Sequence, residues 1–434
     1  MWLNIIKKIS KFRVISILFI LVHPGISIAQ FPKQDTLNLT IIKAEQLFIN
    51  NNLQILAQKY NVDATKALIL QARLYPNPNI NFIQGAYNTQ TGKWFEQDYK
   101  NGEQAYQISQ LIVLSRKINK QVKIAETNFK LAEDDLFDLL RTLKLALRSS
   151  FFNIYYLQQT SKVYNEEINS LKMIVAAYNQ VQGKGYVSEA DDIRVKAQLY
   201  SLQSEYQNLI DNINDLQSQL RLLLQISPNI YLRPVMDTEI VKADPHFYSL
   251  KSLLDSAYIN RADLRIAKDN LTLSQQTYSY QKALSIPDFT AGASLDRHGS
   301  YITNFNALGI GLEIPIFNHN QGNIKNARIL VDYNNTQVHL AQQSLEEEVS
   351  RGLQKAIDAD NLYKGIDPAF AGNFNKLAKE MMEHYMNRTV SLLNFLTFYD
   401  SYKQNIVQLN TILFNKVNAL ENINFLTGTN FFNK

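Results

Sequence analysis

The chain has 434 residues, of which 46% are hydrophobic and 19% are charged, and it contains no cysteine. Disulfide bonds and a lipid-acceptor cysteine are therefore excluded. The formal net charge is +5, but Lys7, Lys8, Lys11 and Arg13 supply four of those charges. Because five minus four leaves only +1 for the rest of the chain, the composition gives no electrostatic case for binding nucleic acid.

The N-terminal segment is predicted to be a secretory signal peptide covering residues 1–29. A basic part runs to Arg13, an apolar part spans 14–22, and Ser27-Ile28-Ala29 places small residues at the cleavage spacing. An N-terminal membrane anchor is the alternative, but about nine apolar residues are fewer than the roughly 20 that a spanning helix requires. No later window has about 18 continuous apolar residues, so we expect no transmembrane helix in the exported chain.

A first structural repeat is predicted over residues 30–228. It begins with a helix that is capped at Thr36 or Asn38 and is stopped by Pro76 and Pro78. Strands are predicted at 79–87 and 104–114. They form a β-hairpin over 79–114, whose polar loop contains Trp94, Phe95 and Tyr99.

Residues 115–226 of this repeat are predicted to form a long helical hairpin. Apolar residues recur at spacings of three and four, and neither proline nor glycine occurs from Ser115 to Gln182. A helix of that length is on the order of 100 Å long, which exceeds an ordinary globular domain. Gly183 and Gly185 interrupt it, and Ser188 caps the return helix.

After a connector at 229–249, the same order of elements repeats over residues 250–434. A helix at 250–284 precedes a β-hairpin at 288–317 and a long helical hairpin at 318–427, with a kink or short break near 365–368 and a turn at 387–391. Three unlike landmarks share the offset 317 − 114 = 203, namely Leu114 and Phe317, Ser188 and Ser391, and Gln225 and Gly428. This period indicates a domain-scale duplication rather than a solenoid.

The second β-hairpin has two unlike faces. Large apolar residues alternate with small or polar ones in the order Leu308, Gly309, Ile310, Gly311, Leu312, Glu313 and Ile314. A hairpin this apolar is not stable in water on its own. We therefore predict that the four large apolar side chains face lipid, and that the two glycines face a lumen.

Four strands in one chain cannot close a barrel, for which about eight are the smallest useful number. Because an open sheet edge is excluded in lipid, strands from other copies must complete it. A dimer supplies eight strands and a trimer supplies 12, and only the trimer leaves room for an aqueous lumen. The predicted fold is mainly α with a small membrane β part, in which long helical hairpins form a trimeric α-barrel continuous with a shared 12-stranded transmembrane β-barrel.

At this point the sequence resembles the TolC-like outer membrane efflux factors over nearly all of the exported chain. The matching pieces are the signal peptide, Tyr75-Pro76-Asn77-Pro78, Ile314-Pro315-Ile316-Phe317 leading into 318–327, Gly185-Tyr186-Val187-Ser188, Thr389-Val390-Ser391 and Asn424-Phe425-Leu426-Thr427-Gly428. The resemblance implies a homotrimer in the cell outer membrane with a large periplasmic portion. It also implies partners: a periplasmic adaptor protein and an inner-membrane pump of the RND or ABC type.

By the same resemblance, the two helical turns are the periplasmic tips that contact the adaptor. The residues concerned are Gly183, Gly185, Val187, Ser188, Arg388, Thr389, Val390 and Ser391. Asn387-Arg388 stands where a glycine is usual in the family. Family members often carry acidic residues at the pore constriction just after this turn, and the matching positions here are Asn394 and Thr397, with Asp400 one turn further. An acidic ring at the aperture is therefore left open.

Candidate chemistry is sparse, and we predict no enzyme activity, no cofactor and no bound metal. Glu346, Glu347 and Glu348 are typical of a solvated helix face, with a cation site as the alternative. Met381, Met382, His384 and Met386 form a soft-ligand cluster that could touch copper or silver in transit, although helix packing is the usual role of such residues. His298 and His319 flank the second hairpin as loop histidines. Trp94, Phe95 and Tyr99 either belong to an aromatic girdle or cover an outer loop.

The predicted function is the outer-membrane channel of a tripartite efflux or type I secretion system, a passive conduit from periplasm to exterior. A periplasmic or surface coiled-coil scaffold without a pore is the alternative, and an exported helical enzyme is disfavoured because no catalytic constellation is found. Drug efflux, metal efflux and protein secretion share this architecture, so the sequence decides neither the cargo nor the pump class.

Overall fold

A computed structural model describes residues 35–98, 101–181, 188–297, 302–367 and 369–432. The predicted signal peptide lies outside these residues. The same order of elements occurs twice. In the first half α1 (Ile41–Asn51) and α2 (Leu53–Ala72) precede two long strands, with two short strands between them, and the helices α3 (Lys117–Val181) and α4 (Glu189–Leu224). In the second half α5 (Leu250–Asn260) and α6 (Ala262–Leu284) precede two strands and the helices α7 (Gln321–Lys364), α8 (Phe370–Met386) and α9 (Leu392–Thr427).

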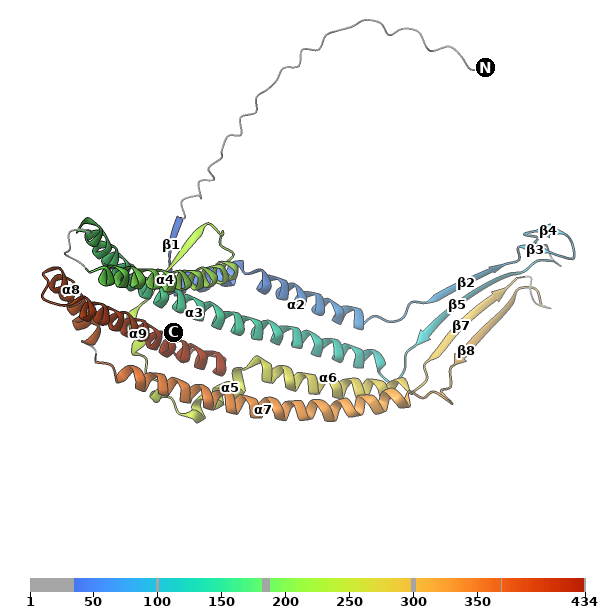
Figure 1. The fold of residues 1–434 in the computed structure, drawn as a ribbon. Helices are drawn as coiled ribbons and strands as arrows, with labels where there is room; N and C mark the ends of the chain where they lie inside the picture. Colours follow the sequence, from blue (N-terminus) through green and yellow to red (C-terminus); the bar gives the residue numbers. More distant parts are fainter. Residues whose placement is uncertain (1–34, 99–100, 182–187, 298–301, 368, 433–434) are drawn as a thin grey trace, which may run out of the picture.

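The strands of both halves join into one antiparallel sheet at one end of an elongated molecule (Figure 1). Its order is β2-β5-β7-β8, from β2 (Asn79–Gln84) through β5 (Gln104–Ile112) and β7 (Phe289–Asp296) to β8 (Phe305–Leu312). The adjoining helices follow the same lateral order, because α2 contacts α3, α3 contacts α6, and α6 contacts α7. Each protomer is therefore a strip with two lateral edges, one at β2 and α2 and the other at β8 and α7.

The helical end of the molecule is a bundle built on the longest helix. The 65 residues of α3 span roughly 100 Å at about 1.5 Å per residue, as the sequence predicts. α4 returns along α3, and α9 packs against α3, α7 and α8 (Figure 1). Of the kink or short break predicted near 365–368, the structure shows the break, because α7 ends at Lys364 and α8 begins at Phe370. Pro368 itself lies outside the described residues.

The prediction that Thr36 or Asn38 caps the first helix is wrong. Residues 35–40 form β1 (Asp35–Thr40), and Thr40 caps α1 by accepting a hydrogen bond from the Lys43 amide at 3.4 Å. The reason is tertiary pairing: β1 lies parallel to β6 (Ile230–Val235), which comes from the predicted connector. The connector also holds the short 3-10 helices η1 (Thr238–Lys242) and η2 (Pro245–Phe247).

Two single residues divide helices that were predicted to be continuous. Asn52 ends α1 and caps α2, since its Oδ1 accepts from the amides of Gln54 (3.0 Å) and Ile55 (3.1 Å). Its Nδ2 donates to the Leu223 carbonyl at 3.0 Å, which ties the break to the end of α4. Arg261 divides α5 from α6 at the corresponding place in the second half.

A hydrophobic core lies where the β1–β6 pair meets the helices. Its buried members include Leu39, Phe48, Phe151, Phe152, Leu220, Leu232 and Val417. Buried Gln217 of α4 completes the edge of β6: its Nε2 donates to the Leu232 carbonyl at 2.6 Å, and its Oε1 accepts from the Leu232 amide at 2.9 Å. The Leu232 carbonyl also accepts from Gln158 Nε2 at 3.1 Å, whereas the Leu232 amide is bonded to Gln217.

Across the described part of the chain, no helix is both long enough and apolar enough to span a membrane.

Gln217→Ala is expected to lower the melting temperature of the purified protein by several degrees. The substitution leaves the buried amide of Leu232 unsatisfied, at a cost of about 1–3 kcal/mol, and it leaves the Leu232 carbonyl with only the bond from Gln158 Nε2. Gln219→Ala, on the exposed side of the same helix, is the matched control and should leave the melting temperature unchanged. Equal melting curves for the two variants would contradict this role of Gln217.

Candidate functional site

The four-stranded sheet has one continuous apolar face. Paired residues share a face of a sheet, so the register places on this side Ile80, Phe82, Tyr106, Ile108, Ile112, Phe289, Ala291, Ala293, Leu295, Leu308, Ile310 and Leu312. Gln84, Gln104, Gln110 and Asn306 are the polar exceptions on that face. Leu308 is 90% exposed and Ile310 is 80% exposed in the protomer. An apolar surface this continuous is a contact surface for another apolar phase or protein.

The opposite face of the sheet is small and polar. It carries Asn79, Asn81, Gln107, Ser109, Thr290, Gly292, Ser294, Gly309 and Gly311, interrupted by Ile83, Leu111 and Phe305. A Cβ added at Gly309 would meet nothing within 4 Å. The register shows the predicted alternation, with Leu308, Ile310 and Leu312 on one face and Gly309 and Gly311 on the other. Ile314 lies beyond the end of β8 and is exposed, and lipid contact of these four residues stays a prediction.

Charged residues lie at the two ends of the sheet and not in its middle. Apart from Asp296, the strands β2, β5, β7 and β8 contain no charged residue. At the helical end, Lys117 and Asp288 form an ion pair at 2.8 Å, and the Asp288 carboxylate accepts from the Leu114 amide at 2.7 Å. The sheet is thus a charge-free band that begins directly after a fixed ion pair.

The second helical turn contains most of the predicted tip residues that can be described. Ser391 caps α9 by accepting from the Asn394 amide at 3.3 Å, and Thr389 closes α8 by donating to the His384 carbonyl at 2.8 Å. Arg388 adopts φ 58°, the left-handed conformation that usually favours glycine. The departure from the family pattern at Asn387-Arg388 is therefore accommodated without a glycine.

Of the predicted tip residues in the first helical turn, Ser188 can be described, whereas Gly183, Gly185 and Val187 lie outside the described residues. Ser188 caps α4 by accepting from the Asp191 amide at 3.0 Å. Ser188 and Ser391 thus occupy equivalent capping positions, as their offset in the sequence predicts.

The three constriction candidates follow each other along α9. Asn394 and Thr397 are exposed, whereas Asp400 is partly buried. The Asp400 carboxylate lies 3.1 Å from Lys403 Nζ and also accepts from Gln404 at 2.8 Å. Asp400 is therefore held in an intrachain ion pair and is a poor source of free negative charge at an aperture.

Sequence reasoning missed one buried acid beside this pair. Glu167 of α3 is 1% exposed, and its Oε2 has no hydrogen-bond partner among the described residues. Burial, which outweighs the attraction of nearby Lys403, raises the pKa of Glu167 to about 8. The available signal was its position, because Val163, Glu167 and Leu171 recur at the spacing of one apolar helix face.

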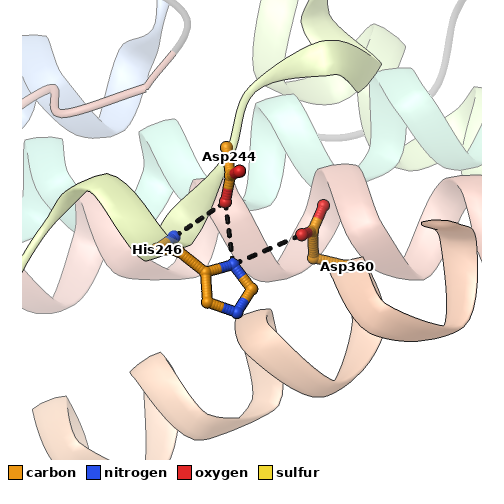
Figure 2. Close-up of side chains that lie close together, drawn as sticks. All are labelled: Asp244, His246 and Asp360. Carbon is orange, nitrogen blue, oxygen red and sulfur yellow. Dashed lines mark hydrogen bonds and ion pairs between the residues drawn. The ribbon is translucent and has the colours of Figure 1, made fainter.

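One group of possible metal ligands stands out among the described residues, formed by Asp244, His246 and Asp360. Figure 2 shows the imidazole of His246 between the two carboxylates, with its Nδ1 2.8 Å from Asp244 Oδ1 and 3.5 Å from Asp360 Oδ2. Lys364 Nζ lies 2.8 Å from Asp244 Oδ2 and 2.7 Å from Asp360 Oδ2, and Lys416 Nζ lies 2.6 Å from Asp360 Oδ1. Two lysines thus balance two carboxylates.

The ionisation of this group follows from these contacts. Bonds from Lys364 lower the pKa of Asp244. Burial opposes ionisation of Asp360, but hydrogen bonds from Lys364 and Lys416 outweigh it, so the pKa of Asp360 is also lowered. The group is an ion-pair network that fastens η2 to α7 and α9, because a divalent cation would have to displace lysines that already neutralise it.

The other candidate ligands are engaged in packing or pairing. Met381 and Met382 pack against the buried cluster that includes Leu171 and Phe395, and Met386 is exposed. His384 Nδ1 lies 3.2 Å from Thr389 Oγ1. Glu346 accepts from the Tyr258 hydroxyl, and Glu348 pairs with Arg261 at 2.8 Å. His319 lies in the exposed segment before α7, and His298 is outside the described residues.

Glu167→Gln is expected to change how stability depends on pH. The folded pKa of Glu167 lies above that of a free carboxyl, so between about pH 4.5 and 8 the folded state binds more protons than the unfolded state. The melting temperature of the unmodified protein should therefore fall as pH rises through this window. The glutamine variant should show a flatter profile and a melting temperature several degrees higher at pH 8. Glu166→Gln, on the exposed neighbour, should keep the original profile, and identical profiles for both variants would contradict the assignment.

Comparison with known proteins gives consistent results. Residues 45–225 match the outer membrane efflux protein family. A curated relative, the cobalt-zinc-cadmium resistance protein CzcC of Cupriavidus metallidurans, is 22% identical over 375 residues, which cover 80% of this chain and 84% of that protein.

Solved structures share the fold over nearly the whole chain. The CmeC outer membrane channel of Campylobacter jejuni superposes with a TM-score of 0.70 at 16% identity, covering 90% of this chain and 86% of that one. The outer membrane protein VceC of Vibrio cholerae gives a TM-score of 0.69 at 12% identity, covering 90% of this chain and 96% of that one. The resemblance to TolC-like outer membrane efflux factors is therefore confirmed: residues 45–225 match the outer membrane efflux protein family, and the fold is that of solved outer membrane channels.

Proposed function

We propose that this protein is the outer-membrane channel of a tripartite efflux or type I secretion system, a passive conduit from the periplasm to the exterior. The observation that carries the proposal is the four-stranded sheet with one exposed apolar face and one small, polar face. An apolar outer face and a polar inner face are what a membrane barrel with an aqueous lumen requires. The helices continue the sheet in the same lateral order, so the lumen extends into the helical part.

The ring closes with copies of the same chain. Within the protomer β2 and β8 each pair on one side only, and such edges are not tolerated in lipid. Pairing β8 of one protomer with β2 of the next makes a heterologous contact that generates a closed ring. Three copies of four strands give 12, which leaves an aqueous lumen. The helices α7 and α2, which lie on the same two edges, meet in the same ring.

The helical turns at Ser188 and at residues 388–391 are proposed to contact a periplasmic adaptor protein, which links the channel to an inner-membrane pump. Both turns lie at the end of the molecule opposite the sheet (Figure 1). The cargo is then chosen by the pump. The similarity to a cobalt-zinc-cadmium resistance protein makes divalent metal ions one candidate cargo. The scaffold alternative is less well supported, because dimer contacts alone leave two unpaired strand edges in each chain.

Ile310→Arg is expected to reduce the amount of assembled protein in the outer membrane strongly. An arginine on the lipid face of a barrel costs about 2–4 kcal/mol near the bilayer midplane. The matched control is Gly309→Arg, one residue earlier on the opposite face, where a side chain meets open space. Heat-modifiable oligomers extracted from outer membranes give the readout. Equal loss in both variants, or in neither, would contradict the assignment of faces.

Ser391→Asp is expected to reduce export at least 10-fold while oligomer levels stay unchanged. Aspartate retains the capping function at the start of α9, so the added charge acts on the adaptor contact and not on the helix. Ser401→Asp, on the exposed side of α9, serves as the control. Export is measured as survival in the presence of the cargo, together with crosslinking to the adaptor. Loss of the oligomer in the first variant would instead mean that the turn is structural.

A further inference from the structure

A second, smaller hairpin stands at the far end of the sheet, beyond the strands that would enclose a lumen (Figure 1). It consists of β3 (Tyr87–Asn88) and β4 (Lys93–Trp94), and it pairs Tyr87 with Trp94. The rings of Tyr87 and Trp94 lie 5.0 Å apart, and those of Trp94 and Phe95 lie 6.3 Å apart. The three side chains are 49%, 69% and 64% exposed, respectively. They form one exposed aromatic group.

The backbone and the polar residues of this hairpin hold the rings in place. The Phe95 amide donates to the Ala86 carbonyl at 2.8 Å, and the Gly92 amide donates to the Asn88 carbonyl at 2.8 Å. The Glu96 carboxylate, only 7% exposed, pairs with Lys93 at 3.2 Å and accepts from Asn88 Nδ2 at 3.1 Å. Large exposed apolar rings on a braced hairpin are a contact surface, since neither the fold nor the lumen uses them.

The position of the hairpin along the strand direction indicates which layer of a membrane the rings contact. The nine residues of β5 rise about 23 Å if each advances about 3.4 Å and the strand is tilted by about 40°. This is close to the apolar band of about 25 Å in a membrane barrel. Lys117 and Asp288 mark one boundary of the charge-free strands, and charges resume at the other end with Asp296 and Glu103. The aromatic hairpin follows directly after that second boundary.

We propose that Tyr87, Trp94 and Phe95 form an anchor that lies in the lipid headgroup region of the outer leaflet. Tyrosine and tryptophan favour this region because one part of each ring is apolar and another part forms hydrogen bonds. Lys93 and Glu96 neutralise each other, so the attraction comes from the rings and not from net charge. The inference rests on the proposed membrane position of the sheet. It adds a lipid-contacting site outside the strands.

The sequence provides a direct reporter for the test. It contains two tryptophans, Trp2 and Trp94, and Trp2 lies in the predicted signal peptide. The full exported protein is reconstituted into phosphatidylcholine vesicles whose acyl chains are brominated either near the carbonyl end or near the methyl end. Trp94 fluorescence should fall at least about 2-fold with the shallow bromines and less with the deep ones. Iodide in the surrounding water should quench it only weakly.

Two control proteins, both in a Trp94→Phe background, separate this inference from the proposed function. Leu308→Trp reports the lipid face of the sheet and should be quenched more by the deep bromines. Tyr200→Trp, exposed on α4, should be insensitive to lipid bromine and quenched by iodide.

If the Leu308→Trp signal responds and the Trp94 signal does not, the anchor is refuted while the channel proposal stands. If neither signal responds, the membrane position of the sheet fails. Iodide quenching of Trp94, or a response to a soluble oligosaccharide in place of lipid, would mark a water-facing platform and overturn the inference.

Discussion

The unpaired edges of a four-stranded sheet determine what the rest of this molecule can do. β2 and β8 each leave one row of backbone hydrogen-bonding groups without a strand partner in the protomer, beside an apolar face that water does not stabilise. A twisted antiparallel sheet resolves both problems at once by closing on copies of itself. The helices α2, α3, α6 and α7 follow the strand order, so the proposed closure of the sheet would also bring the helical edges together.

Closure alone would not fix the two halves of one chain to each other, and a buried polar junction does so. Arg148 of α3 binds Glu421 of α9 through Nε at 2.7 Å and through its terminal amino group at 2.8 Å, and it also pairs with Glu45 of α1. A buried ion pair offsets its desolvation cost only where further contacts neutralise its charges, and here two carboxylates surround one guanidinium. The β1–β6 pair adds a second link, because its strands come from the start of one half and from the connector. The junction is therefore specified by directional contacts as well as by apolar packing.

The sequence predicted those features whose cause is local, and it missed those whose cause is a distant partner. Alternating residues in β8 and the apolar recurrence in α3 carry their own periodicity, so strand faces and helix length could be inferred. β1 has only Leu37 and Leu39 on its apolar side and runs directly into a helix, and it is a strand because β6 lies beside it. Asn52 divides a helix because its side chain reaches the end of α4. Glu167 is notable only once α9 covers it, and the lysines around Asp360 come from positions more than 50 residues apart.

The two halves share an order of elements but differ in mechanical continuity. α3 runs unbroken for 65 residues, whereas its counterpart is divided into α7 and α8. The break follows Lys364, whose ammonium group is fixed by Asp244 of the connector and by Asp360 of α7. The last turn of α7 is thus fixed to the connector, and α8, the helix that leads to the second turn, begins after the break. A displacement of α8 and the start of α9 can then occur without bending α7, whereas a displacement of the first turn must be carried by one continuous helix. The second helical turn is therefore the one that the fold separates mechanically from the sheet.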